Sequence, residues 1–219
     1  MIKALIFDMD GTLVQNMPYH LRAFDELARR HGFEIIEPAN PRFFGMHNSV
    51  IMPQVYSPKS IAGHDIEDLS YEKEAIYREL YAGNVKLTDG LEELFQDAID
   101  NGIKCAIGSA GPVENVEFIV KECNLAERLD VIICNRDVTH CKPDPEIFIK
   151  SCERLGFAPS ECVVFEDAVS GVKAAIAAGC PSVALTSTLD AETLRNAGAD
   201  LVVDDFYGIT IARLQELFG

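Results

Sequence analysis

The sequence lacks long hydrophobic runs, paired cysteines and an excess of basic residues. Its apolar runs, such as residues 174–178, fall far short of the roughly 20 residues that a membrane-spanning helix needs. No basic-then-apolar leader precedes Ile2, and none of the seven cysteines forms a Cys-x-x-Cys pair, so neither a disulfide framework nor a zinc site is indicated. We therefore expect a cytoplasmic protein with reduced, mostly buried cysteines. For Cys141, which precedes Lys142, a reactive thiolate is the alternative interpretation.

Basic residues are scarce: 19 Lys and Arg stand against 35 Asp and Glu, which gives a formal net charge of −16. Because phosphate backbones and anionic lipids are held by basic side chains, this charge argues against nucleic acid and against a membrane surface as partners. The excess of negative charge lies almost entirely outside residues 15–86, a segment with 8 basic and 10 acidic residues. If one part of the molecule closes over an anionic substrate, we expect it to be this segment.

Short apolar runs rich in β-branched residues alternate with helical patterns along most of the chain. Helical spacing is clear at residues 90–101, and also at residues 168–178, where Gly179 and Pro181 end the pattern. Continuous apolar strands separated by helices are typical of a parallel sheet that is covered on both faces. The sequence therefore predicts an α/β fold with strands at residues 2–7, 104–108, 131–134, 163–165, 182–185 and 201–203.

Residues 15–86 interrupt this alternation, because they contain no convincing strand. Helical patterns occur at residues 19–31 and 69–81, and Asn16 is expected to cap the first of these helices. The stretch 37–58, with four prolines, is expected to be largely loop or broken helix. The sequence thus predicts a helical insertion at residues 15–86 within a core formed by residues 1–14 and 87–219.

Polar side chains stand directly after several of the predicted strands. In open parallel sheets, ligands bind beyond the carboxyl ends of the strands, so these residues are candidates for one shared site. The set consists of Asp8 and Asp10 after the first strand, Ser109 after the second, Lys142 opening the helix after the third, and Glu166 with Asp167 after the fourth.

These residue types suit phosphoryl transfer. Mg²⁺ prefers oxygen ligands and is usually bound by one or two carboxylates together with a substrate phosphate, and Asp8 and Asp167 can supply those carboxylates. With a metal ion and Lys142 neutralising the phosphate oxygens, the carboxylate of Asp8 can attack phosphorus and form an aspartyl-phosphate. Asp10, two residues further on, can then donate a proton to the leaving oxygen and later accept one from water.

Each of these residues alone has a simpler interpretation. An Asp-x-Asp-Gly sequence is common in turns and in calcium-type loops. Taken singly, Ser109 would be a helix cap, Lys142 a solvated lysine, and Glu166 with Asp167 a charge pair favoured at a helix start. The order of the residues and their places at strand ends favour the shared site.

Four motifs occur in order along the chain: Asp8–Val14, Ile107–Ser109, Cys141–Glu146, and Phe165–Asp167 followed by Ser170–Gly171 and Ala174–Gly179. With them, the sequence resembles the haloacid dehalogenase superfamily over essentially its whole length. It is most similar to the small-cap branch of phosphatases that includes β-phosphoglucomutase. The resemblance implies a Rossmann-like core that carries an inserted α-helical cap.

The resemblance also implies a role for each core residue, with Mg²⁺ as cofactor. The nucleophile would be Asp8, and Asp10 would be the acid and base. Phosphate would be held by Ser109 and Lys142, and the metal by Asp8, Asp10 through its backbone carbonyl, and Asp167 with support from Glu166. In the cap, His20 and Lys73 resemble residues that face the substrate. The alternative for His20 is that of a packed helix residue.

The function implied is that of a phosphatase, expected to be monomeric, which acts on a small phosphorylated metabolite such as a sugar phosphate. The alternatives are a hexose-phosphate mutase and, far behind, a binding protein without catalysis. In the mutase, the phosphate that is not transferred is held by a cap arginine and by a Ser-Lys pair after the second motif. Those places hold Asn48 and Gly111-Pro112 in this sequence, which favours the phosphatase.

Overall fold

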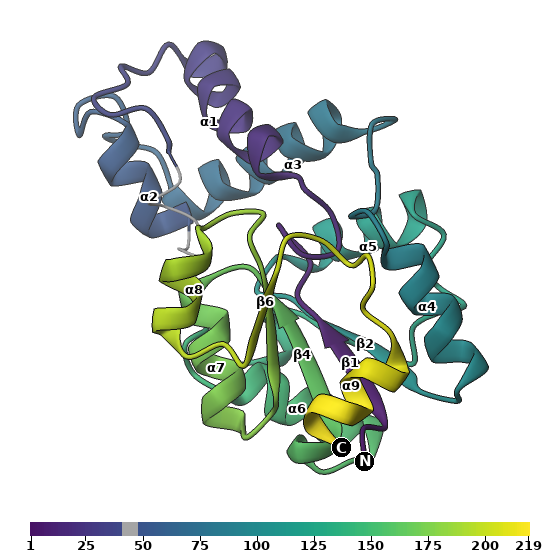
Figure 1. Ribbon diagram of the computed structural model, residues 1–219. Helices are drawn as coiled ribbons and strands as arrows, with labels where there is room; N and C mark the ends of the chain where they lie inside the picture. Colours follow the sequence, from purple (N-terminus) through teal and green to yellow (C-terminus); the bar gives the residue numbers. More distant parts are fainter. Residues whose placement is uncertain (41–47) are drawn as a thin grey trace. The chain divides into compact units, whose positions relative to one another are not determined.

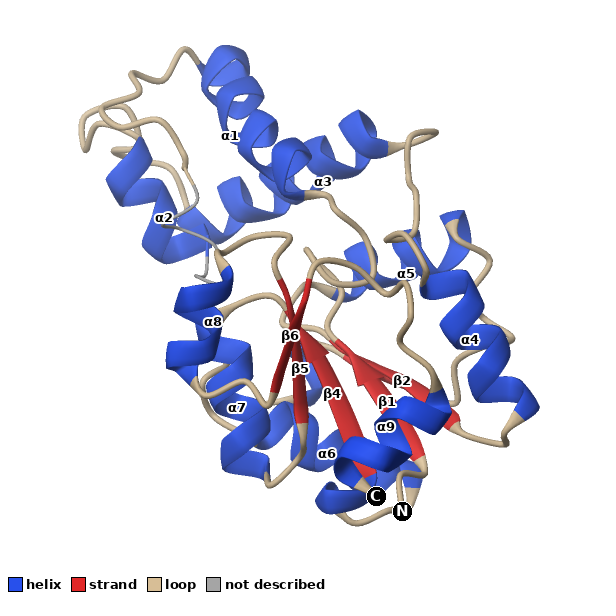
Figure 2. Cartoon of the chain, in the orientation of Figure 1, coloured by secondary structure: helices blue, strands red, loops and turns tan. Residues whose placement is uncertain are grey.

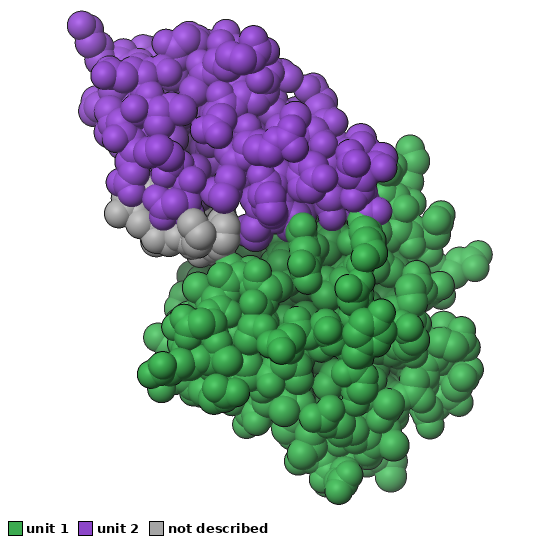
Figure 3. Space-filling view, turned by 45° about the horizontal axis from the view of Figure 1, so that its top comes forward, with its two compact units in different colours: residues 1–15, 86–219 green, residues 16–85 purple. Residues whose placement is uncertain are grey.

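The computed structural model describes residues 1–40 and 48–219. These residues divide into two compact units, one formed by residues 1–15 and 86–219 and the other by residues 16–85 (Figure 3). The chain leaves the first unit and re-enters it at neighbouring points, because Val14 and Leu87 form an antiparallel bridge.

The first unit contains a six-stranded sheet in which all neighbouring strands are parallel, in the order β3-β2-β1-β4-β5-β6. Strands β1, β2, β4 and β6 of this sheet are labelled in Figure 1. The predicted α/β class with a Rossmann-like parallel sheet is confirmed, and the predicted strand ends are correct to within two residues. The strands are β1 (Ala4–Phe7), β2 (Lys104–Gly108), β3 (Val131–Ile133), β4 (Cys162–Glu166), β5 (Ser182–Leu185) and β6 (Leu201–Val203).

The two central strands are buried along their whole length, which explains why their sequences are almost uninterrupted apolar runs. They pair directly, with Phe7 opposite Phe165. The strand order reverses here, since β2 follows on one side of β1 and β4 lies on the other. Ligand sites of open α/β sheets form at such a reversal, next to the carboxyl ends of the strands.

Helices cover both faces of the sheet (Figure 2). On one face of the sheet, the ring of Phe95 packs against that of Phe7 in β1, with the ring centroids 5.3 Å apart. Side chains of α6 and α7, among them Phe148 and Ala174, form a core with the other face. None of the helices in the described ranges is both long and apolar enough to cross a membrane. The helices of this unit are α4 (Leu91–Asp100), α5 (Val113–Glu122), α6 (Glu146–Leu155), α7 (Val169–Ala178), α8 (Ala191–Ala197) and α9 (Ile211–Phe218), with short 3₁₀ turns η2 (Asn135–Asp137) and η3 (Pro159–Glu161).

The second unit is helical, with α1 (Met17–His31) packed against α3 (Ile66–Tyr81) and a short helix α2 (Asn48–Val55) beside them. Buried apolar side chains such as Phe24 and Ile76 form its interior. Within the stretch expected to be loop or broken helix, α2 contains Pro53, and residues 41–47 lie outside the described residues.

Two local predictions are wrong. Asn16 stands at the start of α1 but makes no capping hydrogen bond; its backbone is not in the extended conformation that capping requires, and its amide donates to the Tyr77 hydroxyl at 2.6 Å. Lys142 does not open a helix, because α6 begins only at Glu146. Since the residue before a proline avoids the helical conformation, Asp144 before Pro145 delays the helix.

Candidate active site

Asp8 lies at the carboxyl end of β1 and is 7% exposed. Its backbone N–H donates to the Phe165 carbonyl of β4 at 2.9 Å, which continues the ladder between the two central strands. Because β1 is flanked by strands on both sides, the carboxylate lies near the middle of the carboxyl-terminal end of the sheet and not beside an outer strand.

The chain turns sharply after Asp8, and Gly11 makes this turn possible. The Gly11 N–H donates to the Val14 carbonyl at 2.8 Å, and Gly11 has a φ of +82°, which disfavours other residues. A Cβ atom at this position would lie 2.0 Å from Oδ2 of Asp167. Glycine is therefore required both for the turn and for the close approach of the Asp167 carboxylate.

Glu166 and Asp167 come from the end of β4, next to Asp8. Oε2 of Glu166 accepts the backbone N–H groups of Asp167 at 2.9 Å and of Ala168 at 3.1 Å. This carboxylate thereby fixes the backbone between β4 and α7 while its other oxygen faces the site. Gly171 lies directly against it, because a Cβ there would be 1.8 Å from Cδ of Glu166.

Lys142 reaches into this group of carboxylates from the loop between η2 and α6. Its ammonium donates to Oδ1 of Asp8 and, at 2.6 Å, to Oε1 of Glu166. The side chain is 7% exposed, so the charge is largely removed from water and depends on these two partners.

Ser109 follows β2 and is 1% exposed. Its N–H donates to the Ile133 carbonyl at 3.0 Å, and its hydroxyl oxygen accepts the Gly111 N–H at 3.0 Å. Asp10 lies nearby: a Cβ on Gly111 would be 3.2 Å from Oγ of Ser109 and 3.5 Å from Oδ2 of Asp10. The side chains of Ser109 and Asp10 thus both border the turn at Gly111.

The electrostatics of the site are dominated by buried carboxylates. Burial raises the pKa of Asp8 to about 8; Lys142 opposes this rise, while Glu166 and Asp10 add to it. Burial, together with Glu166 and Asp8, also raises the pKa of Asp167 well above its ordinary value. Burial alone would lower the pKa of Lys142, but attraction to Asp8 and Glu166 raises it. The site therefore contains more carboxyl groups than its one lysine can keep ionised.

This arrangement fits a divalent cation. Asp8, Glu166 and Asp167 each offer a carboxylate oxygen within 4.8 Å of the others, and all three residues are buried. Three buried carboxylates that face one ammonium are costly to ionise together, and a hard cation with oxygen preference would offset their repulsion. Asp10 does not belong to this group of converging side chains among the described residues.

Two residues of the site were not identified from the sequence. The Ser187 hydroxyl donates to the Gly11 carbonyl, and the Thr188 hydroxyl donates to Oδ2 of Asp167. Both lie in the loop after β5, so extending the rule about strand ends to the fifth strand would have found them.

The two expected cap residues lie together in the second unit. Nζ of Lys73 is 2.8 Å from Nδ1 of His20 and 2.9 Å from Oε1 of Glu74. The His20 ring stacks on Tyr77 with centroids 3.8 Å apart. The amide of Asn48 donates to the same oxygen of Glu74 at 2.7 Å. The Glu74 carboxylate therefore joins Lys73 and Asn48, and Lys73 in turn contacts His20.

Comparison with known proteins gives consistent results. Residues 2–179 match the family described as haloacid dehalogenase-like hydrolase. The chain is 34% identical to validoxylamine A 7'-phosphate phosphatase of Streptomyces hygroscopicus subsp. limoneus, over 94% of each chain. It is 30% identical to a phosphorylated carbohydrates phosphatase of Thermotoga maritima, over 92% of this chain and 94% of the relative. Its fold resembles β-phosphoglucomutase from Clostridium difficile with a TM-score of 0.84, 27% identity and coverage of 100% and 97%.

Proposed function

Because the chain belongs to the haloacid dehalogenase-like hydrolases and is a phosphoric monoester hydrolase, we propose that it releases phosphate from small phosphorylated metabolites through an aspartyl-phosphate on Asp8. The observation that carries this proposal is the convergence at Asp8. A buried carboxylate, a lysine bonded to it and a neighbouring carboxylate pair come from separate segments of the chain to the edge of one sheet.

In the first step, an oxygen of Asp8 attacks phosphorus and the bond between phosphorus and the ester oxygen breaks. Asp10 gives its proton to the departing oxygen, so the first product leaves as an alcohol. The Lys142 ammonium and the Ser109 hydroxyl hold the phosphoryl oxygens, on which negative charge is concentrated. Asp8 is suited to this role because its backbone is fixed by the central sheet.

In the second step, water attacks the phosphorus of the aspartyl-phosphate and Asp10 accepts the proton of that water. The bond between the Asp8 oxygen and phosphorus breaks, and the carboxylate and inorganic phosphate are released. Asp10 ends the cycle protonated, as it began. The same residue therefore serves as acid and then as base.

Mg²⁺ is the proposed cofactor, and Asp8 and Asp167, with Glu166, would hold it. When bound, it supplies positive charge that offsets the repulsion between these carboxylates and a phosphate dianion. Glu166 also keeps the backbone of Asp167 in place through the hydrogen bond that it accepts.

Sugar monophosphates are the proposed substrates, since one relative is named for phosphorylated carbohydrates. The mutase resemblance implies cationic side chains for a second phosphate at two positions, and this chain has a cationic side chain at neither of them. Asn48 uses its amide to bind Glu74, and Gly111-Pro112 carries no charged side chain. We therefore propose hydrolysis in preference to mutase activity, with His20 and Lys73 as substrate-facing residues of the cap.

The test is to supply the purified protein and Mg²⁺ with a panel of phosphate esters and to assay both free phosphate and sugar isomers. We expect phosphate release from several esters. We also expect isomerisation of β-glucose 1-phosphate to be slower than its hydrolysis, even with glucose 1,6-bisphosphate as primer. Conversion to glucose 6-phosphate much faster than phosphate release would instead establish the mutase. The absence of both phosphate release and isomerisation with every ester would reject both reactions.

A further inference from the structure

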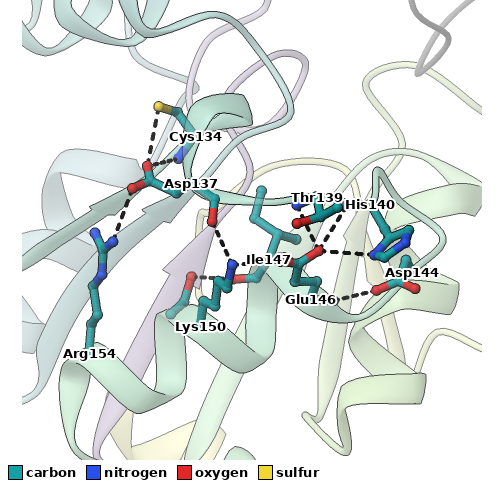
Figure 4. Close-up of polar contacts among 10 residues, drawn as sticks. Cys134, Asp137, Thr139, His140, Asp144, Glu146, Ile147, Lys150 and Arg154 are labelled. Atoms are coloured by element: carbon teal, nitrogen blue, oxygen red, sulfur yellow. Dashed lines mark hydrogen bonds and ion pairs between the residues drawn. The ribbon is translucent and has the colours of Figure 1, made fainter.

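Helix α6 carries three charged residues at intervals of four: Glu146, Lys150 and Arg154. At this spacing they lie along one side of the helix. Figure 4 shows that all three turn toward the segment between β3 and α6, which contains Lys142. The sequence assigned no role to any of them.

Glu146 binds the backbone of this segment directly. Its Oε2 accepts the N–H groups of both Thr139 and His140 at 2.8 Å (Figure 4). Its own N–H donates to Oδ1 of Asp144 at 2.9 Å. Contacts from Glu146 thus hold the loop on both sides of Lys142, within three residues before it and two after it.

Lys150 and Arg154 extend the attachment toward β3. Nζ of Lys150 donates to Oε1 of Glu146 at 2.5 Å and to the Asp137 carbonyl at 2.7 Å. Nη2 of Arg154 donates to Oδ1 of Asp137 at 3.0 Å, and Oδ2 of Asp137 accepts the Cys134 N–H at 3.0 Å. A row of polar contacts therefore runs from the end of β3 to the loop of Lys142.

The same helix also supports the lysine side chain. Nζ of Lys142 lies 4.9 Å from the centroid of Phe148, which is fully buried two residues after Glu146. The Glu146 side chain is 17% exposed, and Lys150 with the two backbone N–H groups lowers its pKa to about 2. Glu146 is accordingly a carboxylate with both oxygens engaged, and α6 contacts both the loop that carries Lys142 and the ammonium end of this lysine.

We propose that Glu146 is a positioning residue for catalysis: it holds the loop so that the Lys142 ammonium meets the transferred phosphoryl group. This inference rests on the proposed function. The inference follows from the contacts that Glu146 makes on both sides of Lys142. None of these contacts involves the reacting atoms, so Glu146 acts through Lys142. Displacement of a catalytic group by about 1 Å can cost about a hundredfold in rate, so loss of this attachment affects catalysis beyond its effect on folding.

The test compares Glu146→Ala, Glu146→Gln and Glu153→Gln in the full chain with Mg²⁺. Glu153 is the control, because it is an exposed residue of the same helix. We expect Glu146→Ala to lower kcat/KM about tenfold to a hundredfold, and Glu153→Gln to change it less than twofold. Glu146→Gln should recover part of the loss, since its amide oxygen can still accept the two backbone N–H groups. Equal activity of Glu146→Ala and wild type would overturn the inference.

A second measurement separates positioning from general damage. Inorganic phosphate, titrated by calorimetry with Mg²⁺ present, should bind about tenfold more weakly to Glu146→Ala than to wild type. In a Lys142→Ala background the same change should alter phosphate binding less than twofold, because no ammonium remains to be positioned. An equal loss in both backgrounds would contradict the inference. If wild type binds phosphate but hydrolyses no ester, the proposed function fails while this cycle still decides the role of Glu146.

Discussion

At the scale of residues, the site contains several carboxylates but few positive charges, and this imbalance explains why the proposed phosphoryl transfer needs a bound cation. Asp8, Glu166 and Asp167 converge within 4.8 Å, and Lys142 is bonded to two of them. An ionised Asp8 is therefore unfavourable in the folded protein without a cation, as its raised pKa shows. In the proposed reaction, a bound cation favours ionisation of Asp8, and the carboxylate then serves as the nucleophile toward phosphorus.

Asp8→Asn should lower kcat by at least about a thousandfold without lowering the melting temperature. The substitution keeps the shape of the side chain but removes the nucleophilic oxygen pair. Because the raised pKa leaves the side chain of Asp8 largely protonated near neutral pH in the absence of a cation, its replacement by a neutral amide should change stability little. The measurements are phosphate release and thermal unfolding, with Asp68→Asn, an exposed position on α3, as the control. Substantial activity in Asp8→Asn would move the nucleophile elsewhere.

Lys142→Ala should impair catalysis more than Lys73→Ala does. Both lysines are buried and paired with a carboxylate, so loss of a charged partner is common to both variants. Of the two, Lys142 contacts Asp8, and in the proposed reaction its ammonium holds the group that is transferred, so its loss should lower kcat. Steady-state kinetics on one sugar phosphate gives the comparison. A larger fall in kcat for Lys73→Ala would count against the assigned roles.

At the scale of elements, the site depends on how closely the helices approach the strand ends. The start of α7 shows this, because Gly171 lies against the Glu166 carboxylate and has no room for a side chain. Local propensity alone would favour alanine over glycine inside a helix by about 1 kcal/mol. The close approach therefore overrides the propensity of the element.

Gly171→Ala should destabilise the protein and lower its activity, although the change raises helix propensity. A Cβ at this position would lie 1.8 Å from Cδ of Glu166, so that carboxylate must leave its place between Lys142 and the Asp167 N–H. Thermal unfolding and kcat/KM measure the two effects. Ser170→Ala, the preceding position of α7, serves as the control. A Gly171→Ala protein as stable and active as wild type would show that Glu166 can move without loss.

The sequence predicts the strands better than the loops for a physical reason. Central strands such as β1 are buried on both faces, so their apolar runs are directly visible, and polar residues such as Asp8 mark where they end. Loop positions depend on distant partners. The role of Asn16 is decided by Tyr77, some 60 residues further along, and that of Glu146 by backbone N–H groups that carry no residue-specific signal. Thr188 follows β5, so the rule about strand ends applies to it, although a threonine by itself carries no catalytic signal.

At the scale of the whole molecule, the acidic character and the site are connected. The chain has a net charge of −16, and three buried carboxylates of the first unit lie together at one sheet edge. Such a protein repels anions in general, so its affinity for a phosphate ester must come from local positive charge. Lys142 supplies one such charge, and the proposed cation supplies the remainder.

Mg²⁺ should therefore both activate the protein and stabilise it against heat. A ligand that binds only the folded state at 100 times its Kd adds about 2.7 kcal/mol, which for a chain of this size corresponds to a rise in melting temperature of roughly 5–10 °C. Chelation should abolish phosphate release, and added Mg²⁺ should restore it. Asp167→Asn should lose most of the thermal shift, since it removes one of three converging carboxylates, whereas Asp68→Asn should keep it. Full activity in excess chelator, or an equal thermal shift in Asp167→Asn and wild type, would show that the cation does not bind at this sheet edge.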